Sequence, residues 1–159
     1  MSLIIILIIG TFFLDRISKI LVTTNMHILD SFNIIPNFFN ITYAQNFGAA
    51  FSFLNGGRYL FILIAIIVII ITLIFLKNNI KKISILDKIS LSIIVGGTLG
   101  NLLDRMIYGY VIDFLDFKIF NYDYPIFNLA DTFIVVGAII LIINSVRNDI
   151  NVKNKSRRK

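Results

Sequence analysis

Four long apolar stretches constrain this chain more than any other feature of its sequence. They cover residues 3–22, 59–76, 84–106 and 127–146. A helix needs about 20 mainly apolar residues to cross a bilayer, and each stretch reaches or approaches that length. The first has no basic residue before it and no cleavage motif of small residues after it, so we expect a retained helix. The sequence therefore predicts an all-α membrane protein with four transmembrane helices, as one membrane-embedded domain over residues 1–159.

The placement of charge predicts how these helices are oriented. The chain has 15 lysine and arginine residues against nine acidic residues. The basic residues gather between the second and third stretches and in the tail at 147–159, whereas segments 23–58 and 107–126 hold few. Because basic loops remain on the cytoplasmic side, we expect both termini inside and these two segments outside. Topology thus explains the positive charge, and no nucleic-acid partner is expected.

The composition excludes several kinds of catalytic chemistry. The chain has no cysteine, no tryptophan and one histidine, His27. Disulfides, thiol nucleophiles and cysteine-based metal sites are therefore ruled out. A Ser-His-Asp device would have to use His27, which has no nucleophile-elbow motif near it. All nine acidic residues are aspartates, so aspartate is the candidate for chemistry.

Two aspartates flank the second outer segment. Asp113 lies in "GYVIDF" after the third stretch, and Asp131 lies in "FNLAD" at the start of the fourth. If this segment folds back, the two carboxyls meet at the membrane surface. Repulsion makes it unfavourable for two neighbouring carboxyls to be ionised at the same time. One therefore keeps its proton while the other acts as a base, as in aspartyl hydrolases. The alternative is that each aspartate caps a helix at a wet interface.

Other charged residues lie within the apolar stretches themselves. Asp15 and Lys19 are four residues apart, so they share a helix face and can neutralise each other inside the bundle, in a structural or a functional role. We expect Arg16 to extend outward. Asn101, Asp104 and Arg105 also share one stripe near the outer end of the third stretch. For the Asp-Arg pair the alternative is a structural clamp.

The outer segments predict less regular structure. In residues 31–54, aromatic and β-branched residues alternate in part, which predicts a small extracytoplasmic β-sheet on the membrane. Asn46 and Gly48 combine a polar amide with a flexible turn, suited to holding an extended peptide, although such turns are commonly structural. We expect residues 107–126 to be a loop, whose aromatic part from 115 to 124 closes as a lid.

These motifs together resemble a known family. "DRISK", "NFGAAFS", "GNLLDR" followed by "GYVIDF", and "FNLAD" stand in the order and positions of the motifs of the bacterial lipoprotein signal peptidases, the type II signal peptidases. The resemblance covers nearly the whole chain. It implies a membrane-embedded aspartyl endopeptidase, without metal or other cofactor, that removes the signal peptide from prolipoproteins just before a diacylglyceryl-modified cysteine.

The resemblance also implies roles for individual residues. Asp113 and Asp131 match the family's two catalytic aspartates. Asp15 and Lys19 match its buried first-helix pair and are assigned to structure near the site. Substrate binding or support of the catalytic pair is implied for Asn46, Gly48, Asn101, Asp104, Arg105 and Asn128. The expected partners are lipid-modified prolipoprotein signal peptides and membrane lipid, for a monomer in the bacterial cytoplasmic membrane with its site near the extracytoplasmic face.

Two further aspartates, Asp116 and Asp123, lie close to Asp113 in the chain. Either could take its place as far as the residues alone decide. We rank them lower because the motif ends at Asp113, and because Asp116 would point about 60° away from it on a helix.

Two other classes of protein would also keep aspartates in a small helical bundle. An ion or proton conductor is one, but its charges are usually spaced through the membrane, whereas these cluster at one face. A metal-dependent lipid phosphotransferase is the other, with aspartates around Mg²⁺. Its carboxylates are expected on the cytoplasmic side, with an Asp-Gly-rich motif that this chain lacks.

Overall fold

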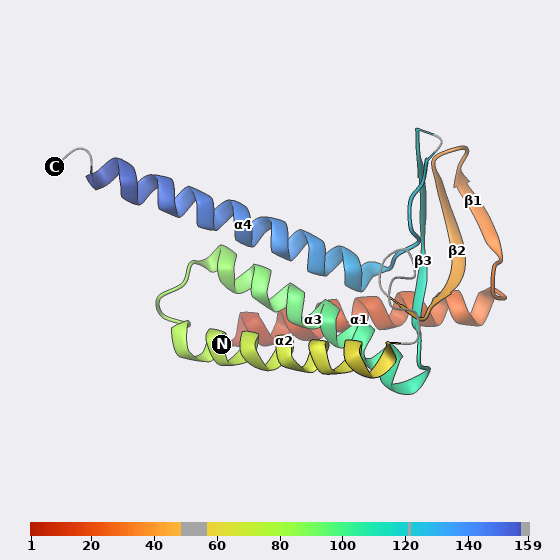
Figure 1. Ribbon diagram of the computed structural model, residues 1–159, viewed down its shortest axis with the longest axis horizontal. Helices are drawn as coiled ribbons and strands as arrows, with labels where there is room; N and C mark the ends of the chain where they lie inside the picture. Colours follow the sequence, from red (N-terminus) through yellow and green to blue (C-terminus); the bar gives the residue numbers. More distant parts are fainter. Residues whose placement is uncertain (49–56, 121, 157–159) are drawn as a thin grey trace.

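A bundle of helices with a small sheet across one end makes up the fold. The structure, a computed structural model, describes residues 1–48, 57–120 and 122–156. The helices are α1 (Ser2–Asn25), α2 (Arg58–Asn79), α3 (Ile85–Ile107) and α4 (Leu129–Ser156), and the strands are β1 (Ser31–Ile35), β2 (Phe39–Asn46), β3 (Val111–Ile119) and β4 (Tyr122–Asp123). The sheet stands across the helices, and the N-terminus and the last turns of α4 lie away from it (Figure 1).

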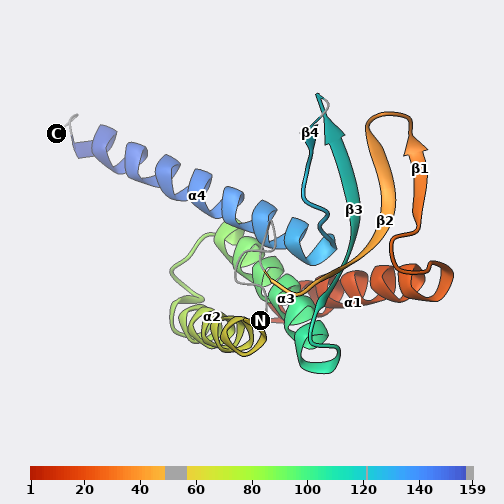
Figure 2. The same cartoon turned by 45° about the vertical axis from the view of Figure 1, so that its right-hand side comes forward.

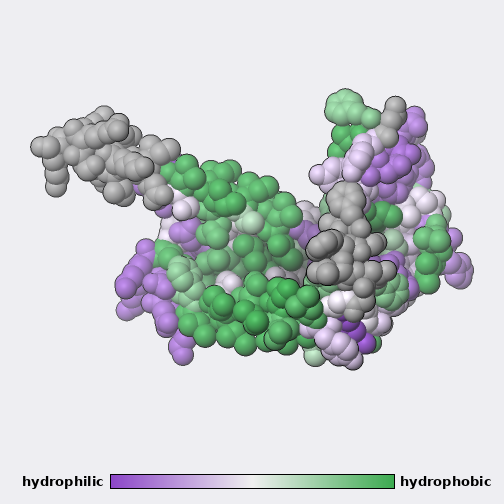
Figure 3. Space-filling model, viewed as in Figure 1, coloured by the Kyte–Doolittle hydropathy of each residue, from purple (hydrophilic) through white to green (hydrophobic). Residues whose placement is uncertain are grey.

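Three described helices are long and apolar enough to cross a membrane: α2, α3 and the Leu129–Asn148 part of α4. Many of their apolar side chains are exposed on the surface of the protein. In α2 only Ala65, Ile69 and Leu76 are buried, and the helix surfaces form a continuous hydrophobic area (Figure 3). An apolar surface of this extent is typical of contact with lipid. The fourth predicted span, α1, has 24 residues but carries three charged residues along its length.

Glycines of α3 allow its neighbours to approach closely. A Cβ atom added at Gly97 would lie 2.5 Å from the carbonyl oxygen of Ala130 in the first turn of α4. One added at Gly96 would lie 2.7 Å from the carbonyl oxygen of Ile8 in α1. Small residues at helix interfaces permit this kind of backbone contact in membrane proteins. As a result α3 is the central helix, against which α1, α2 and α4 all pack.

We expect Gly97→Ala to lower the stability of the folded protein by about 1–3 kcal/mol, because the added methyl group meets backbone that cannot move aside freely. Gly10→Ala is the matched control, since an added Cβ there has no atom within 4 Å among its described neighbours. Thermal unfolding in detergent should show a lower midpoint for Gly97→Ala and no decrease for Gly10→Ala. Equal midpoints for the two variants would contradict the packing role of Gly97.

The four strands form one antiparallel sheet in the order β1-β2-β3-β4. The prediction of β structure within 31–54 is confirmed for β1 and β2, and residues 49–54 lie outside the described residues. The prediction that 107–126 is a loop is wrong for 111–119 and 122–123. Residues 111–119 form a strand because they pair with β2, about 70 residues earlier in the chain. Such distant pairing leaves little local signal.

Candidate active site

Asp113 and Asp131 belong to one hydrogen-bonded cluster. Asp113 lies in β3 with 2% of its surface exposed, and Asp131 lies in the first turn of α4. The Asn128 Nδ2 group donates to Asp113 Oδ1 at 2.6 Å, and the Asn101 Nδ2 group donates to Asp131 Oδ1 at 2.7 Å. Asn128 Nδ2 also donates to Asn101 Oδ1 at 3.1 Å. Two asparagines therefore connect the two carboxyls.

The start of α4 positions both Asn128 and Asp131. The Asn128 side-chain oxygen accepts from the Asp131 backbone N–H at 2.9 Å, and the Asn128 backbone N–H donates to Asp131 Oδ2 at 3.3 Å. This reciprocal pair is a capping box, which satisfies backbone donors at a helix start. The capping alternative is thus correct for Asp131, but only one of its oxygens is used in this way. The other oxygen faces Asn101.

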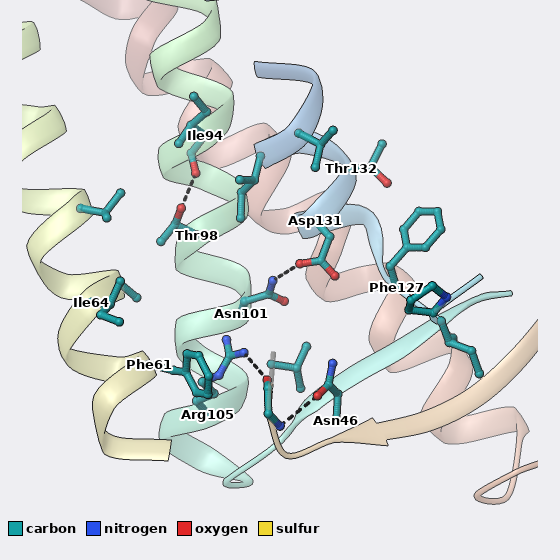
Figure 4. A pocket seen from close by; sticks show the side chains of 18 of the residues that line it. Asn46, Phe61, Ile64, Ile94, Thr98, Asn101, Arg105, Phe127, Asp131 and Thr132 are labelled. Atoms are coloured by element: carbon teal, nitrogen blue, oxygen red, sulfur yellow. Dashed lines mark hydrogen bonds between the residues drawn. The ribbon is translucent and has the colours of Figure 1, made fainter. Parts of the chain in front are cut away.

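The end of β2 holds Asp113 from the other side. Asn46 Nδ2 donates to Asp113 Oδ2 at 2.9 Å, while Asn46 Oδ1 accepts from the Gly48 backbone N–H at 2.9 Å. Arg105 Nη2 donates to the Gly48 carbonyl oxygen at 3.2 Å, and its guanidinium lies 4.9 Å from the centre of the Phe61 ring. Figure 4 shows Asn46, Asn101, Arg105 and Asp131 gathered around one space.

Beneath this cluster lies a buried group of charges from α1 and α3. Lys19 has none of its surface exposed, and its Nζ lies 2.8 Å from Asp15 Oδ2 and 2.9 Å from Asp104 Oδ2. Arg16 pairs with Asp104. The expectation that Arg16 extends outward is wrong, because this pairing holds it at 9% exposure. Two cations and two carboxylates balance, which is the condition under which charges can be buried.

Lys19 also contacts the hydrogen-bonded cluster. Its Nζ donates to Asn101 Oδ1 at 2.9 Å, the same oxygen that accepts from Asn128. An amide oxygen that accepts from two donors leaves the amide nitrogen on the opposite side, where it meets Asp131. Lys19 and Asn128 together therefore orient the Asn101 amide, and through it the donor that Asp131 receives.

Burial and a neighbouring charge alter the acidity of Asp113. Loss of hydration and the nearby Asp131 carboxylate raise the pKa of Asp113 to about 7, while hydrogen bonds from Asn46 and Asn128 and the charge of Lys19 act in the opposite direction. A carboxyl of this kind holds its proton close to neutral pH. The pair can thus contain one protonated and one ionised carboxyl.

The cluster faces a cavity of about 830 Å³ between α2, α3 and α4. Its polar lining includes Asn46, Gly48, Asn101, Arg105 and Asp131. Most of the remaining lining is apolar and comes from the three helices and from residues 124–127. Asp113 is not among the described lining residues, but it is bonded to Asn46, which is. The cavity therefore combines a carboxyl and a guanidinium with an apolar interior.

Three other aspartates lie outside the cavity. Asp104 is fully buried and accepts from the Ile112 backbone N–H at 3.2 Å. Its ion pairs are with Lys19 and Arg16 of α1, and not with Arg105 as in the expected clamp. Asp116 accepts from Thr42 Oγ1 at 2.6 Å, and exposed Asp123 pairs with Lys118 at 3.1 Å. Asp116 lies in a strand, so the helical angle of about 60° expected between it and Asp113 was wrong. In a strand, an offset of three residues places it on the face opposite Asp113.

Arg58, at the start of α2, is a further residue near the site that the sequence did not indicate. Its Nε donates to the Arg105 carbonyl oxygen at 2.8 Å, and its Nη2 donates to the Met106 carbonyl oxygen at 2.9 Å. These carbonyls belong to the last turn of α3, where the carbonyl groups have no hydrogen-bond partners within the helix itself. Arg58 thereby secures the turn that carries Arg105. No local pattern signals this contact, because the two residues are 47 positions apart.

Comparisons with known proteins show which chains this one resembles. Residues 6–147 match the family model described as signal peptidase (SPase) II. The chain is 40% identical over 141 residues to a lipoprotein signal peptidase of Staphylococcus aureus (strain bovine RF122 / ET3-1), covering 89% of this chain and 86% of that protein. It is 45% identical over 141 residues to a lipoprotein signal peptidase of Alteromonas mediterranea, covering 86% of this chain and 76% of that protein.

Two solved structures have the same fold. One is a bacterial membrane enzyme determined by the in meso method at 2.3 Å resolution, with a TM-score of 0.87 and 37% identity over 95% of this chain and 92% of that one. The other, a bacterial membrane enzyme at 1.9 Å resolution, has a TM-score of 0.81 and 38% identity, and the match covers 91% of this chain and 92% of that one. The chain therefore has the fold of solved bacterial membrane enzymes.

Proposed function

Because the chain belongs to the signal peptidase II family, we propose that Asp113 and Asp131 are the catalytic pair with which it removes signal peptides from prolipoproteins. The protein is an aspartic-type signal peptidase of bacterial membranes. An ion conductor and a metal-dependent lipid phosphotransferase are not favoured, since the family's activity is peptide cleavage. The observation that carries the assignment is the cluster in which Asn101 and Asn128 connect the two carboxyls.

The raised pKa of Asp113 assigns it the proton in the resting pair, with Asp131 ionised at the cavity. Asp131 takes a proton from the attacking water as the water oxygen bonds to the scissile carbonyl carbon. Asp113 passes its proton to the carbonyl oxygen, and the product of both transfers is a tetrahedral diol. When the C–N bond breaks, Asp131 gives its proton to the leaving amine and Asp113 regains one from the diol. Both carboxyls then return to their starting states.

Other polar residues are proposed to hold the reacting groups. Asn46, Asn101 and Asn128 donate N–H groups that keep both carboxyls in place. Arg105, packed on Phe61 and bonded to Gly48, directs its remaining donors toward the carbonyl groups of an extended peptide. Asp15, Lys19 and Asp104 support this arrangement from below without touching the substrate.

The membrane topology is part of the same proposal. α1 crosses the bilayer as a fourth span, since its charged residues face α3 rather than lipid. Both termini are cytoplasmic, and the sheet and the catalytic pair lie at the extracytoplasmic face of a single domain. The enzyme works as a monomer without a cofactor. The lid expected at 115–124 is proposed to cover bound substrate as part of the sheet, since 115–119 belong to β3 and 122–123 to β4 and do not form the irregular loop expected from the sequence.

The apolar part of the cavity suits the lipid on the substrate. Ala65 and Val68 of α2 and Ile134 and Val135 of α4 line it toward the membrane interior. A cysteine carrying diacylglycerol remains in the bilayer, so its chains can lie between these helices while the adjacent peptide bond reaches Asp131. We therefore assign cleavage to the bond just before the lipidated cysteine.

The test is cleavage by the purified protein in detergent, with EDTA present. A diacylglyceryl-modified prolipoprotein is compared with the same precursor without lipid, and products are followed by gel shift. We expect cleavage of the lipidated form alone. No cleavage of either precursor by folded protein, or cleavage that depends on added divalent metal, would contradict the proposal.

We expect the cleavage rate to have a bell-shaped dependence on pH with its alkaline limb near pH 7, where Asp113 loses its proton.

The proton on Asp113 also affects the stability of the folded protein. Between pH 3.8, the ordinary pKa, and about pH 7, the folded protein keeps this proton and the unfolded chain has lost it. The stability that the protonated Asp113 contributes therefore falls as the pH rises through this range. Unfolding midpoints should therefore fall more steeply over this range in wild type than in Asp113→Asn. Identical slopes would contradict the raised pKa.

A further inference from the structure

The sheet has two faces of opposite character. On one face, Thr42 Oγ1 donates to Asp116 Oδ2 at 2.6 Å and lies 2.8 Å from Ser31 Oγ, while Asn33 Nδ2 donates to Asn40 Oδ1 at 2.9 Å. These polar side chains bridge β1, β2 and β3 in a continuous ladder. Hydrogen bonds between neighbouring strands of this kind are typical of a surface in water.

The other face of the sheet is apolar. Phe39 pairs with Phe117 and Ile41 pairs with Leu115, so all four side chains point to the same side. Phe117 also stacks on Phe127, with ring centres 5.7 Å apart, and Phe127 leads directly into α4. The apolar face is therefore the one on the side of α4, and the polar ladder faces away from α4. Ile112 and Phe114 share the face of Asp116 and pack against Val22 and Met26 near the end of α1.

Both turns of the sheet lie at the same end and carry exposed apolar side chains. The Lys118 backbone N–H donates to the Phe38 carbonyl oxygen at 2.9 Å, which joins the two turns. We call Phe38, Ile119, Phe120 and Tyr122 the aromatic rim, and their exposed fractions are 45%, 40%, 100% and 53%. Figure 2 shows the β1–β2 turn and the β3–β4 end side by side, away from α1.

Phe120 is the most unusual member of this rim. Its φ is +49°, in the left-handed region that suits glycine or asparagine and is unfavourable for a bulky side chain. The turn of the other hairpin uses Asn37, with φ +59°, at its left-handed position. A phenylalanine that is both strained and fully exposed is not explained by contacts within the described chain. It calls for a partner outside the chain.

The position of the rim indicates which partner. α3 ends at Ile107 and α4 begins at Leu129, so the sheet lies at the end of the membrane-crossing helices. It stands across them, and the rim extends sideways past the start of α4 (Figure 1). The hydrophobic surface at the tip of the sheet and that of α4 are visible on the same side of the molecule (Figure 3). The rim residues are absent from the described lining of the cavity.

We propose that the aromatic rim inserts into the headgroup region of the outer leaflet and holds the sheet flat on the bilayer. Aromatic side chains favour this interfacial zone, and a two-faced element lies in it with its apolar face toward the lipid. This proposal depends on the membrane topology and not on the assignment of the catalytic pair.

The absence of tryptophan from the chain makes a direct test possible. Phe120→Trp and Ile119→Trp each introduce a single fluorophore at the rim, and Asn33→Trp introduces one on the polar ladder as the matched control. Each protein is reconstituted in vesicles of phosphatidylcholine and phosphatidylglycerol, with or without bromine on the acyl chains near the headgroup. Circular dichroism and cleavage of the lipidated precursor establish that each variant is folded.

We expect the two rim tryptophans to emit at shorter wavelength than Asn33→Trp and to lose at least about half of their emission in brominated vesicles. Asn33→Trp should emit as in water and lose little. Water-like emission from both rim positions would overturn the proposal, as would a blue shift without bromine quenching, which would indicate a protein partner. Equal quenching of Asn33→Trp and the rim positions would overturn the assigned orientation of the sheet.

Discussion

Asparagine at position 113 or at position 131 is expected to lower cleavage of the lipidated precursor by about a thousandfold or more. Each substitution keeps the shape of the side chain but removes its ability to exchange a proton, and the mechanism needs one protonated and one ionised carboxyl. The remaining aspartate cannot supply both functions. Initial rates on the lipidated precursor, with protein shown to be folded by its unfolding midpoint, measure the effect.

Asp123→Asn is the matched control for this experiment. Asp123 lies ten residues after Asp113 but is exposed and pairs only with Lys118 at the surface, where ion pairs contribute little. Its rate should stay within about twofold of wild type. A residual rate within tenfold of wild type for Asp113→Asn or Asp131→Asn would remove that residue from the catalytic pair.

The second large effect concerns Lys19. Replacing it by methionine leaves Asp15 without its cationic partner inside the bundle, and removal of one member of a buried ion pair costs about 3–5 kcal/mol. We expect Lys19→Met to be strongly destabilised or unfolded, as measured by its unfolding midpoint in detergent. Asp104 retains Arg16, so the loss should come mainly from Asp15.

A double variant separates stability from catalysis. Asp15→Asn with Lys19→Met removes one charge of each sign and should restore most of the stability. Cleavage should remain at least about tenfold below wild type, because Asn101 loses one of the two N–H donors that orient it toward Asp131 and keeps only that of Asn128. Recovery of the full wild-type rate together with stability would limit Lys19 to a structural role.

Part of the site follows from local sequence rules. The placement of Asp131 near the start of α4, with Asn128 three residues before it, follows from the sequence because capping depends on neighbours in the chain. The pairing of Asp15 with Lys19 is local in the same sense, since a helix brings residues four apart together. Apolar length predicted α2, α3 and α4 for a similar reason.

Other features depended on contacts between distant segments. Residues 111–119 form a strand because β2 pairs with them, and this pairing points Asp113 and Asp116 to opposite faces. Arg16 is buried because Asp104, 88 residues later, meets it. Arg58 reaches the end of α3 only after α2 packs against that helix. None of these contacts has a signature within a short window of sequence.

The sequence by itself therefore determined the apolar helices, the cap at the start of α4 and the residue types available for chemistry. These depend on hydrophobic length and on neighbours within one helical turn. Only the tertiary structure decided that Asn101 and Asn128 connect Asp113 to Asp131 and that Lys19 orients Asn101. The physical reason is that a hydrogen bond needs its two atoms within about 3 Å. For residues on different elements, that distance is set by how α1, α3, β3 and α4 pack.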